Sequence, residues 1–331
     1  MISVIIPAYN AEKTITQCIK SLLDQTVVRE AYEVIVVNDG STDNTEELLK
    51  SLGIRYYSQA NQGPAAARNK GVALSQGDVV LFTDSDCVAE KNWIQEMLSP
   101  FKNSEIVAVK GRYKSHQKGI IPRFAQLEFE ERYSLLEKYP YIDFVDTYSA
   151  GFRKEIFLAV GGFDPSFPHA NNEDVDLSYR LAHKGYLMVY NPKAIIYHQH
   201  PTGLLKYLKL KFWRGYWRMV VYRRYPSKAL KDSYTPFNLK AQIVLFYLLL
   251  GNMPFFSLKT FKYNIIILIV IFIATTISFN KIAIKKDPLV ALLSPFLIFL
   301  RAVALGLGSL RGVWSTVRTP QRKILYIFLL I

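Results

Sequence analysis

Residues 81–90 read LFTDSDCVAE, an apolar run that ends directly in two carboxylates, Asp84 and Asp86, with Ser85 between them. One interpretation is structural, because acids at the end of a strand often cap the next helix or stay solvated. The other is functional: hard cations such as Mg²⁺ and Mn²⁺ prefer oxygen ligands, and Mg²⁺ is usually held by one or two carboxylates plus substrate phosphates. The pair alone is a weak signal, so the surrounding sequence has to distinguish the structural from the functional interpretation.

That context is a regular alternation of strands and helices over residues 2–111. The β-rich runs ISVIIP, YEVIVVND, IRYY, DVVLFTD and EIVAVKG alternate with helical stretches such as AEKTITQCIKSLLDQ and GPAAARNKGVALSQG. This order predicts an α/β fold, with a mostly parallel central sheet and helices on both of its faces. Ligands of such sheets bind beyond the carboxyl ends of the strands. The segments PAYN (7–10), NDGSTD (38–43) and DSD (84–86) should therefore meet at one edge.

Residues 112–199 are less regular. They contain helix candidates in FAQLEFEERYSLLEK and EDVDLSYRLAHKG, a loop rich in Gly, Pro and Asn, and two short strand candidates, YLMVYN and AIIYHQ. No G-x-G-x-x-G follows the first strand, which excludes a dinucleotide oxidoreductase. We found no internal repeat.

The net charge of +14 belongs to the C-terminal part of the chain. Residues 200–331 hold 20 Lys or Arg against Asp232 and Asp287 only, which leaves 21 basic and 25 acidic side chains in residues 1–199. A basic segment interleaved with long apolar runs indicates anionic lipid headgroups rather than nucleic acid as the partner. The segment GLLKYLKLKFWRGYWRMVVYRRYP is typical of an amphipathic helix at a membrane interface.

Two uncharged spans follow, residues 241–258 and 263–280, and each is just long enough to cross a bilayer. A third candidate, residues 288–310, is interrupted by Arg301. Lysines flank these segments on every side, so the distribution of positive charge does not set the topology. The alternative is that these are buried helices of a large soluble core.

Cysteines and the first residues indicate the compartment. Cys18 and Cys87 provide neither a disulfide framework nor a metal-ligand spacing, which suits a reducing environment. MISVIIPAYN lacks the features of a signal peptide, so the N-terminal half is expected in the cytoplasm.

The motifs SVIIPAYNAEKTITQCIKSLLDQT, EVIVVNDGSTDNT, GPAAARNKG and GDVVLFTDSDC, in this order and spacing, resemble the nucleotide-binding half of family-2 glycosyltransferases of the GT-A fold. The resemblance covers residues 1–200. It implies inverting transfer of a hexose-type sugar from a nucleotide-diphosphate donor, with uracil as the expected base, and a divalent metal, Mn²⁺ or Mg²⁺. The expected organisation is a catalytic domain over 1–200 (1–111 for the nucleotide-sugar, 112–200 for the acceptor), an interfacial segment over 201–238 and a membrane region of two to three helices over 239–331.

The resemblance also implies roles for single residues on the donor side. Pro7, Ala8 and Tyr9 would wall the nucleotide base, Asp39 would accept hydrogen bonds from base or ribose, and Arg68 would reach the nucleotide. Asp84 would hold the ribose or sugar, and Asp86 would ligate the metal under the diphosphate. Asn10 and Ser85 complete the predicted nucleotide-sugar site. Taken singly, Pro7 could be a plain strand stop and Asp39 a turn residue.

A second acidic cluster, NNEDVDL (171–177), lies where the family carries an acidic pair. Inverting transfer needs a base on the acceptor side, and a carboxylate can serve, particularly if burial raises its pKa. We predict Asp174 as the base and Glu173 as a residue that shapes the acceptor site. Acids also favour helix N-termini through capping and the macrodipole, which is the structural alternative.

Further candidates lie on the acceptor side and at the metal. Gly151 and Phe152 occur in a stretch that resembles the family's acceptor side, although Phe152 can equally be core. Some relatives use a histidine at the position of His198 as a further ligand, and imidazole suits Mn²⁺-like ions. Processive synthases of the family carry Gln-x-x-Arg-Trp on an interfacial helix, whereas here Trp213 precedes Arg214 without that glutamine. Both residues stay candidates on the acceptor side.

The sequence thus predicts a multi-pass membrane enzyme with a cytoplasmic catalytic domain that glycosylates a lipid-linked or membrane-presented acceptor, in the synthesis of cell-surface glycans or glycolipids. The acceptor follows from location alone. The alternatives are a processive polysaccharide synthase and a catalytically inactive membrane scaffold that keeps a sugar-nucleotide fold. The oligomeric state stays open.

Overall fold

The computed structural model describes residues 1–167, 172–255 and 257–318. The described part of the chain divides into two compact units. The first unit contains residues 1–116 and 136–199, and the second contains residues 117–135 together with the described residues between 200 and 318. Residues 117–135, which the sequence placed in the acceptor half, therefore group with the C-terminal part.

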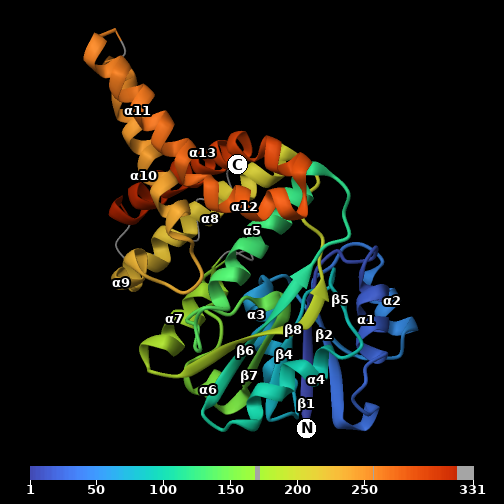
Figure 1. The fold of residues 1–331 in the computed structure, drawn as a ribbon. Coiled ribbons are helices and arrows are strands. Elements are labelled where there is room, and N and C mark those ends of the chain that lie inside the picture. The colour runs from blue at the N-terminus through green and yellow to red at the C-terminus, as the bar shows by residue number, and fades with distance from the viewer. Residues whose placement is uncertain (168–171, 256, 319–331) are drawn as a thin grey trace. The chain divides into compact units, whose positions relative to one another are not determined.

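The first unit is built on one eight-stranded sheet with the order β3-β2-β1-β4-β7-β6-β8-β5 (Figure 1). Its strands are β1 (Ile2–Ala8), β2 (Tyr32–Asp39), β3 (Arg55–Gln59), β4 (Val79–Phe82), β5 (Val88–Ala89), β6 (Ile106–Lys114), β7 (Ala150–Arg153) and β8 (Leu187–Tyr197). The pairs β1–β2, β1–β4, β2–β3 and β6–β8 are parallel, while β7 pairs antiparallel with β4 and β6, and β5 antiparallel with β8. The predicted mostly parallel sheet is confirmed.

Helices connect these strands. They are α1 (Ile15–Leu23), α2 (Thr45–Ser51), α3 (Pro64–Leu74), α4 (Trp93–Leu98), α6 (Lys154–Ala159) and α7 (Glu173–His183). The central strands are buried along nearly their whole length, and Val4, Ile5 and Ile6 of β1 have no exposed surface. Strands covered on both faces read as continuous apolar runs, which is why the β1 and β2 segments are so apolar in sequence.

Helix α3 lies unusually close to β1 because a glycine faces the strand. A Cβ built on Gly71 would lie 2.3 Å from Cγ2 of Ile5, so any larger side chain would push the helix away from the sheet. Arg68 is one turn earlier on the same face of α3, since residues i and i+3 share a face. This packing brings the Arg68 guanidinium to Asp84, just beyond the carboxyl end of β4.

One local expectation differs from the structure. The segments YLMVYN and AIIYHQ form a single strand, β8, instead of two. Its register against β6 shifts between Lys110↔Tyr190 and Arg112↔Ile195. Pro192 lies inside this bulge and cannot donate a ladder hydrogen bond, which explains why the sequence suggests a break.

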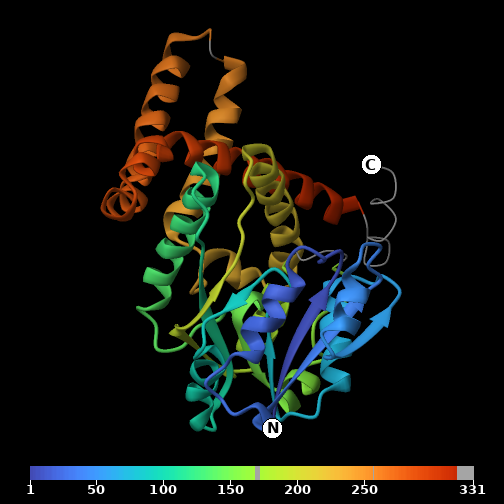
Figure 2. The same cartoon turned by 90° about the vertical axis from the view of Figure 1, so that its right-hand side faces the viewer.

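The second unit is helical. It contains α5 (Ile120–Leu136, of which residues up to 135 belong here), α8 (Leu204–Arg224), α9 (Pro226–Leu230), α10 (Phe237–Asn252), α11 (Lys259–Thr275), α12 (Ile277–Lys286) and α13 (Pro288–Arg318). A buried cluster joins Phe124 of α5, Tyr207 of α8, Phe279 of α12 and Ile298 of α13. Helices α10 and α11 form a hairpin that extends beyond the other helices of this unit, and α13 runs across its base (Figures 1 and 2).

Among the described residues, one helix segment, Pro288–Ser315, is long and apolar enough by itself to cross a membrane, and half of its apolar window is buried. The helices over Lys262–Thr275 and Ile277–Lys286 meet this criterion only together, with a bend of 43° between them. Length and composition alone are weak indicators of a membrane span. The predicted number of spans stays a prediction.

Candidate active site

The carboxyl ends of β1 and β4 border a cleft of about 500 Å³. Its lining comes from the PAYN segment, the residues that lead into α1, the loop after β2 and the DSD loop: Tyr9, Asn10, Ala11, Glu12, Lys13, Thr14, Asp43, Ser85 and Asp86. Tyr9 is 53% exposed and therefore free to contact a ligand, whereas Ala8 is buried and Pro7 partly buried. The predicted meeting of PAYN and DSD is confirmed by this lining.

Asn10 ties the first of these loops to the second. It has a left-handed backbone, with φ of 50°, which Asn tolerates better than other non-glycine residues. Its backbone N–H donates to Ser41 Oγ at 3.0 Å, and its Oδ1 accepts from the Thr42 N–H at 2.8 Å. The loops after β1 and β2 are thus held together beside the cleft.

Asp39 is buried at the end of β2, and protein donors surround its carboxylate. Oδ1 accepts from Gln59 Nε2 at 2.8 Å and from the Gln62 N–H at 2.9 Å, and Oδ2 accepts from the Gly63 N–H at 2.8 Å. The carboxylate therefore fixes the loop that leads into α3. Its predicted contact with base or ribose stays a prediction beside this structural role.

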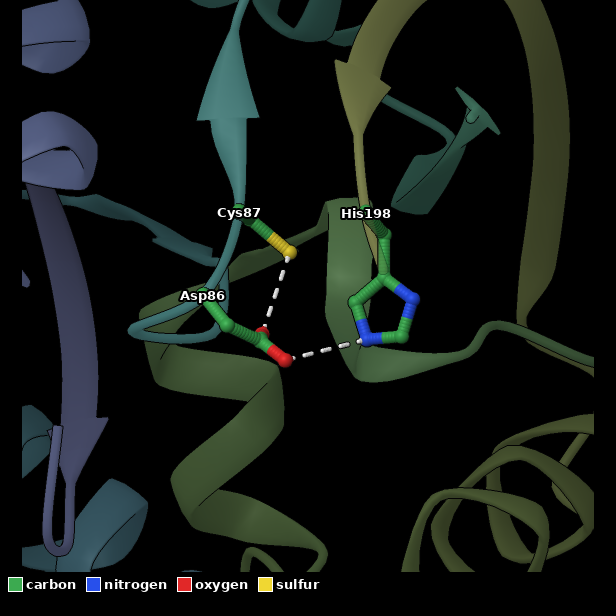
Figure 3. A group of neighbouring side chains, drawn as sticks. All are labelled: Asp86, Cys87 and His198. Carbon is green, nitrogen blue, oxygen red and sulfur yellow. Dashed lines mark hydrogen bonds and ion pairs between the residues drawn. The ribbon is translucent and has the colours of Figure 1, made fainter. Parts of the chain in front are cut away.

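Asp86 and His198 face each other, with 3.5 Å between Oδ2 and Nε2 (Figure 3). The Cys87 sulfur lies 3.9 Å from the other carboxylate oxygen, and these three side chains form a group that could hold a metal ion. His198 follows β8 directly, and its backbone N–H donates to the Lys114 carbonyl at 2.9 Å. The two predicted ligands therefore come from segments far apart in the chain, the loop between β4 and β5 and the residue after β8.

This donor set fits a hard or borderline divalent cation. Asp86 is 40% exposed and supplies carboxylate oxygen, and His198 supplies imidazole nitrogen, both suitable for Mn²⁺. Burial raises the pKa of Asp86, His198 opposes this rise and Asp84 adds to it. A bound cation would favour the ionised form of Asp86 and offset the repulsion between the Asp84 and Asp86 carboxylates. The thiol of Cys87 is buried, and burial raises its pKa, so it contributes poorly to a site for a hard ion.

Arg68 connects the donor motif to the second acidic cluster. Its Nη2 donates to Asp84 Oδ1 at 2.7 Å, and its Nη1 donates to Glu173 Oε1 at 2.9 Å. The Arg68 and Glu173 side chains are 1% and 2% exposed, while Asp84 retains 20%. Burial acts to lower the pKa of Arg68, but the two carboxylates outweigh it. The predicted nucleotide contact of Arg68 stays a prediction, and the observed partners are protein carboxylates.

Asp174 is the partly exposed member of the acidic pair at the start of α7. Burial raises the pKa of its carboxyl to about 7, and the charges of Glu173 and Asp146 add to the rise. Asn172, just before the pair, has φ of 68° and turns the chain sharply into the helix. Glu173 is thereby directed inward to Arg68, while Asp174 keeps access to solvent.

The remaining acceptor-side candidates lie elsewhere. A Cβ on Gly151 would meet Leu81 at 2.9 Å and Phe101 at 3.2 Å, so this glycine permits close packing inside the sheet rather than close approach of a substrate. Phe152 is 1% exposed and packs edge-on against Phe82, which agrees with its alternative interpretation as a core residue. Trp213 and Arg214 are on α8 of the second unit, where Arg311 lies over the Trp213 ring. Their acceptor role stays a prediction.

Sequence reasoning missed several residues of the site. Tyr113 and Tyr148 pack edge-on against the His198 ring, with centroids 5.6 and 4.6 Å away, and Glu12, Lys13 and Asp43 line the cleft. Asp43 is the last residue of the quoted NDGSTD segment, and Glu12 and Lys13 follow the PAYN segment closely, so the motifs themselves indicate where these three residues lie. The tyrosines carry no motif, because only the tertiary packing brings them to His198.

Comparison with known families gives two matches. The profile described as Glycosyl transferase family 2 matches residues 3–161, and the one described as Glycosyl transferase family group 2 matches residues 118–280. Together they cover the sheet, the cleft and the first helices of the second unit.

Curated relatives agree with these matches. A probable glycosyltransferase, YdaM, of Bacillus subtilis is 28% identical over 233 residues, which is 66% of this chain and 53% of the relative. The pre-mycofactocin glycosyltransferase of Mycobacterium tuberculosis is 28% identical over 69% of this chain and 48% of its own length. The glucosyl-dolichyl phosphate glucuronosyltransferase of Haloferax volcanii is 26% identical over 68% of this chain and 79% of its own. The chain spans about half the length of the first two.

Among solved structures, a mannosyltransferase from Pyrobaculum calidifontis, in complex with GDP-Man and Mn²⁺, has a TM-score of 0.60 and 18% identity, covering 95% of this chain and 87% of that one. This likeness concerns the fold, which is GT-A-like. The family matches and the curated relatives lead to one conclusion: the chain belongs to the family-2 glycosyltransferases.

Proposed function

We propose that this glycosyltransferase moves a sugar, with inversion, from a nucleotide-diphosphate donor to a lipid-linked acceptor presented at the cytoplasmic face of a membrane. One observation carries the proposal: Arg68 donates hydrogen bonds to Asp84 of the donor motif at 2.7 Å and to Glu173, the neighbour of the proposed base Asp174, at 2.9 Å. Donor and acceptor chemistry thus share a single rigid frame.

The donor would occupy the cleft that Tyr9 and Asp86 line. The Tyr9 ring is available to stack on the base, and a uracil base is the first expectation. The Pyrobaculum neighbour binds GDP-Man with Mn²⁺, so a guanine donor belongs in the same test. Asp86 and His198 would hold a divalent cation, which would supply charge neutralisation for the departing diphosphate.

On the acceptor side, Asp174 in its ionised form would take the proton from the attacking hydroxyl. The oxygen then forms its bond to the anomeric carbon from the side opposite the diphosphate, the bond between that carbon and the diphosphate oxygen breaks, and the configuration inverts. A pKa of about 7 suits this task, since a general base works best when its pKa is close to the working pH.

Membrane attachment explains why the acceptor would be a lipid. The second unit exposes apolar helices and a basic segment, and two curated relatives are named for pre-mycofactocin and for glucosyl-dolichyl phosphate. A polyprenyl-phosphate-linked sugar is an acceptor of the same class as the second of these. Multi-pass anchoring and a cytoplasmic orientation form part of the proposal.

The test is transfer from UDP- and GDP-sugars to polyprenyl-phosphate and lipid-linked sugar acceptors in detergent with Mn²⁺, followed by NMR of the product linkage. The proposal expects a glycolipid whose anomeric configuration is opposite to that of the donor. A product with retained configuration would contradict the role of Asp174.

A further inference from the structure

The hairpin of α10 and α11 exposes more apolar surface than a water-soluble helix pair carries. Six large apolar side chains of α11, each at least 45% exposed, are Ile266, Ile267, Ile269, Val270, Ile271 and Ile273. Successive residues of a helix point about 100° apart, so the run from 269 to 271 alone faces three directions. Among the described side chains of α11, Ile265 and Phe272 are buried. A helix that is apolar on all sides needs an apolar surrounding.

The charges at the two ends of the hairpin match a bilayer. Residues 241–258 and 263–280 contain no charged side chain, while Lys240 and Lys281 stand at the base and Lys259 and Lys262 at the tip. Helices α10 and α11 are 16 and 17 residues long, which corresponds to about 24 and 26 Å against a hydrocarbon thickness of about 30 Å. The lysine side chains at their ends can extend to the headgroups across the remaining distance. Lysines at both ends are suited to the phosphates of the two headgroup layers. This complementarity favours lipid over a protein partner.

Helix α13 is the longest apolar helix of the unit, yet its centre holds a buried ionic network. Arg301 Nη1 donates to Glu128 Oε1 of α5 at 2.9 Å, and Lys211 Nζ of α8 donates to the other oxygen of that carboxylate at 2.8 Å. Arg301 Nη2 also donates to Gln242 of α10 at 2.6 Å, at the root of the hairpin. If α13 crossed a bilayer, this cluster of charges would lie near the middle of the hydrocarbon, where charged groups are costly.

The C-terminal half of α13 packs on the basic helix α8. A Cβ on Gly308 would lie 1.9 Å from the Phe212 carbonyl oxygen, and one on Gly215 would lie 2.3 Å from that of Leu305, so the two backbones touch. Helix α8 carries Lys206, Lys209, Arg214, Arg218, Arg223 and Arg224. Such a helix stays at the level of the headgroups, and α13 must stay at the same level. Arg123 pairs with Asp287 at the other end of α13.

We propose that the α10–α11 hairpin is the element that crosses the bilayer, and that α13 lies along the membrane surface with its apolar face toward the lipid. Exposed Leu292, Phe296 and Leu307 of α13 would then rest at the level of the upper acyl chains. The inference rests on the membrane attachment contained in the proposed function. It assigns different depths to two helices that are equally apolar in sequence.

The test measures depth in vesicles of phosphatidylcholine and phosphatidylglycerol. Single cysteines at Ile267 in the hairpin and at Leu307 in α13 carry the fluorophore NBD in the full chain, and wild-type protein, whose Cys18 and Cys87 are buried, gives the labelling background. Lipids with a quencher at acyl carbon 12 should quench the label at 267 more than those with a quencher at carbon 5. The label at 307 should show the reverse order and be quenched by aqueous iodide.

Three quenching results would overturn the inference in proteins that bind the vesicles. One is deep quenching at position 307, another is iodide quenching at 267, and the third is a label at 267 that neither iodide nor lipid quenchers reach. The last would mean that hairpins of two copies cover each other, and a doubled mass in light scattering would accompany it. Failure of the proteins to bind vesicles would equally contradict it.

A pair of charge variants gives an independent measure. Ile267→Lys combined with Val270→Lys should weaken vesicle partitioning by about tenfold or more, because charge at mid-bilayer is strongly disfavoured. Phe296→Lys on α13 should weaken it less, since a lysine there can reach the headgroups. Equal losses would contradict the assignment. Titration of the same proteins with nucleotide-sugar donors tests the proposed transferase function separately. The membrane placement of the hairpin and the transferase function can therefore be contradicted independently.

Discussion

Arg68 and Glu173, 105 residues apart in the chain, form a buried ion pair with 2.9 Å between Nη1 and Oε1. The pair joins α3, which follows the nucleotide side of the sheet, to the first turn of α7, which carries the proposed base. The same guanidinium also binds Asp84. We therefore expect a displacement of Asp84 to be transmitted to Glu173, and the reverse. We therefore treat Arg68 and Glu173 as positioning residues for Asp174.

The first prediction concerns this pair. Glu173→Gln keeps the shape and one acceptor oxygen but weakens the hold of Arg68, so kcat for transfer should fall by up to about 10²-fold, as expected when a reacting group is slightly misplaced. The donor Kd should change little, and calorimetry with the donor measures it. Asp176→Asn is the matched control, since Asp176 is buried on the same helix and pairs with Arg180 at 2.7 Å. If the control lost as much kcat, helix stability would explain the effect.

Removal of the base is the second prediction. Asp174→Asn should bind donor and metal as the wild type does and lose about 10²- to 10⁴-fold in transfer, the usual contribution of a general base. Slow hydrolysis of the donor by water, measured for the variant and the wild type in the same assay, separates activation of the acceptor from activation of the donor. Loss of donor binding would remove Asp174 from the role of base.

The pH dependence gives the third prediction. As the proposed base, Asp174 would react in its carboxylate form, and its pKa is raised to about 7 by burial first and by the charge of Glu173 second. Transfer should therefore rise with pH up to about 7 and then level off. Glu173→Gln removes the second cause and should move this limb to lower pH. A rate that falls as pH rises through 7, or a limb that Glu173→Gln leaves in place, would contradict the assignment.

The metal site allows a fourth prediction. Asp86→Ala and His198→Ala should each raise the Mn²⁺ concentration needed for half-maximal activity by about tenfold or more, since each removes a proposed ligand. Cys87→Ser should leave this concentration unchanged, because a buried thiol adds little to a site for a hard ion. A Mn²⁺ titration of activity after EDTA treatment measures all three. Full activity of Asp86→Ala with Mn²⁺ dependence intact would refute the site.

The fifth prediction concerns packing in the second unit. Gly308→Ala places a methyl group against the Phe212 carbonyl, and because backbone atoms cannot move aside easily, it should cost about 1–3 kcal/mol in the free energy of unfolding. Gly251→Ala is the control, since a Cβ there meets nothing within 4 Å. Thermal unfolding in detergent should show a lower Tm for the first variant only. Equal Tm values would mean that α8 and α13 are not in close contact.

Much of the first unit could be predicted from the sequence, because its strands are short apolar runs and its polar motifs follow them directly. The edge where PAYN and DSD meet follows from parallel topology alone. The partners of Arg68 could not be predicted, since no local pattern links residues 68 and 173. Gly151 shows the same limit: a glycine beside a site motif suggests access for a substrate, but only the packing of Leu81 and Phe101 shows that it serves the core.

The second unit was less predictable for a different reason. By hydropathy, residues 263–280 and 288–310 are both candidate spans, although α13 carries Arg301 with partners on α5 and α10. Those partners come from helices far apart in the chain. Contacts of this kind decide which apolar helix faces lipid, and composition does not contain them.

The most direct test of the central claim is calorimetric titration of the purified full chain with a panel of UDP- and GDP-sugars, in Mn²⁺, Mg²⁺ or EDTA. The account predicts that one donor binds selectively, that EDTA abolishes or greatly weakens this binding, and that Asp174→Asn leaves it intact. If no donor bound under any metal condition, the claim of a nucleotide-sugar transferase would be contradicted, and a membrane scaffold with a retained fold would be the better description.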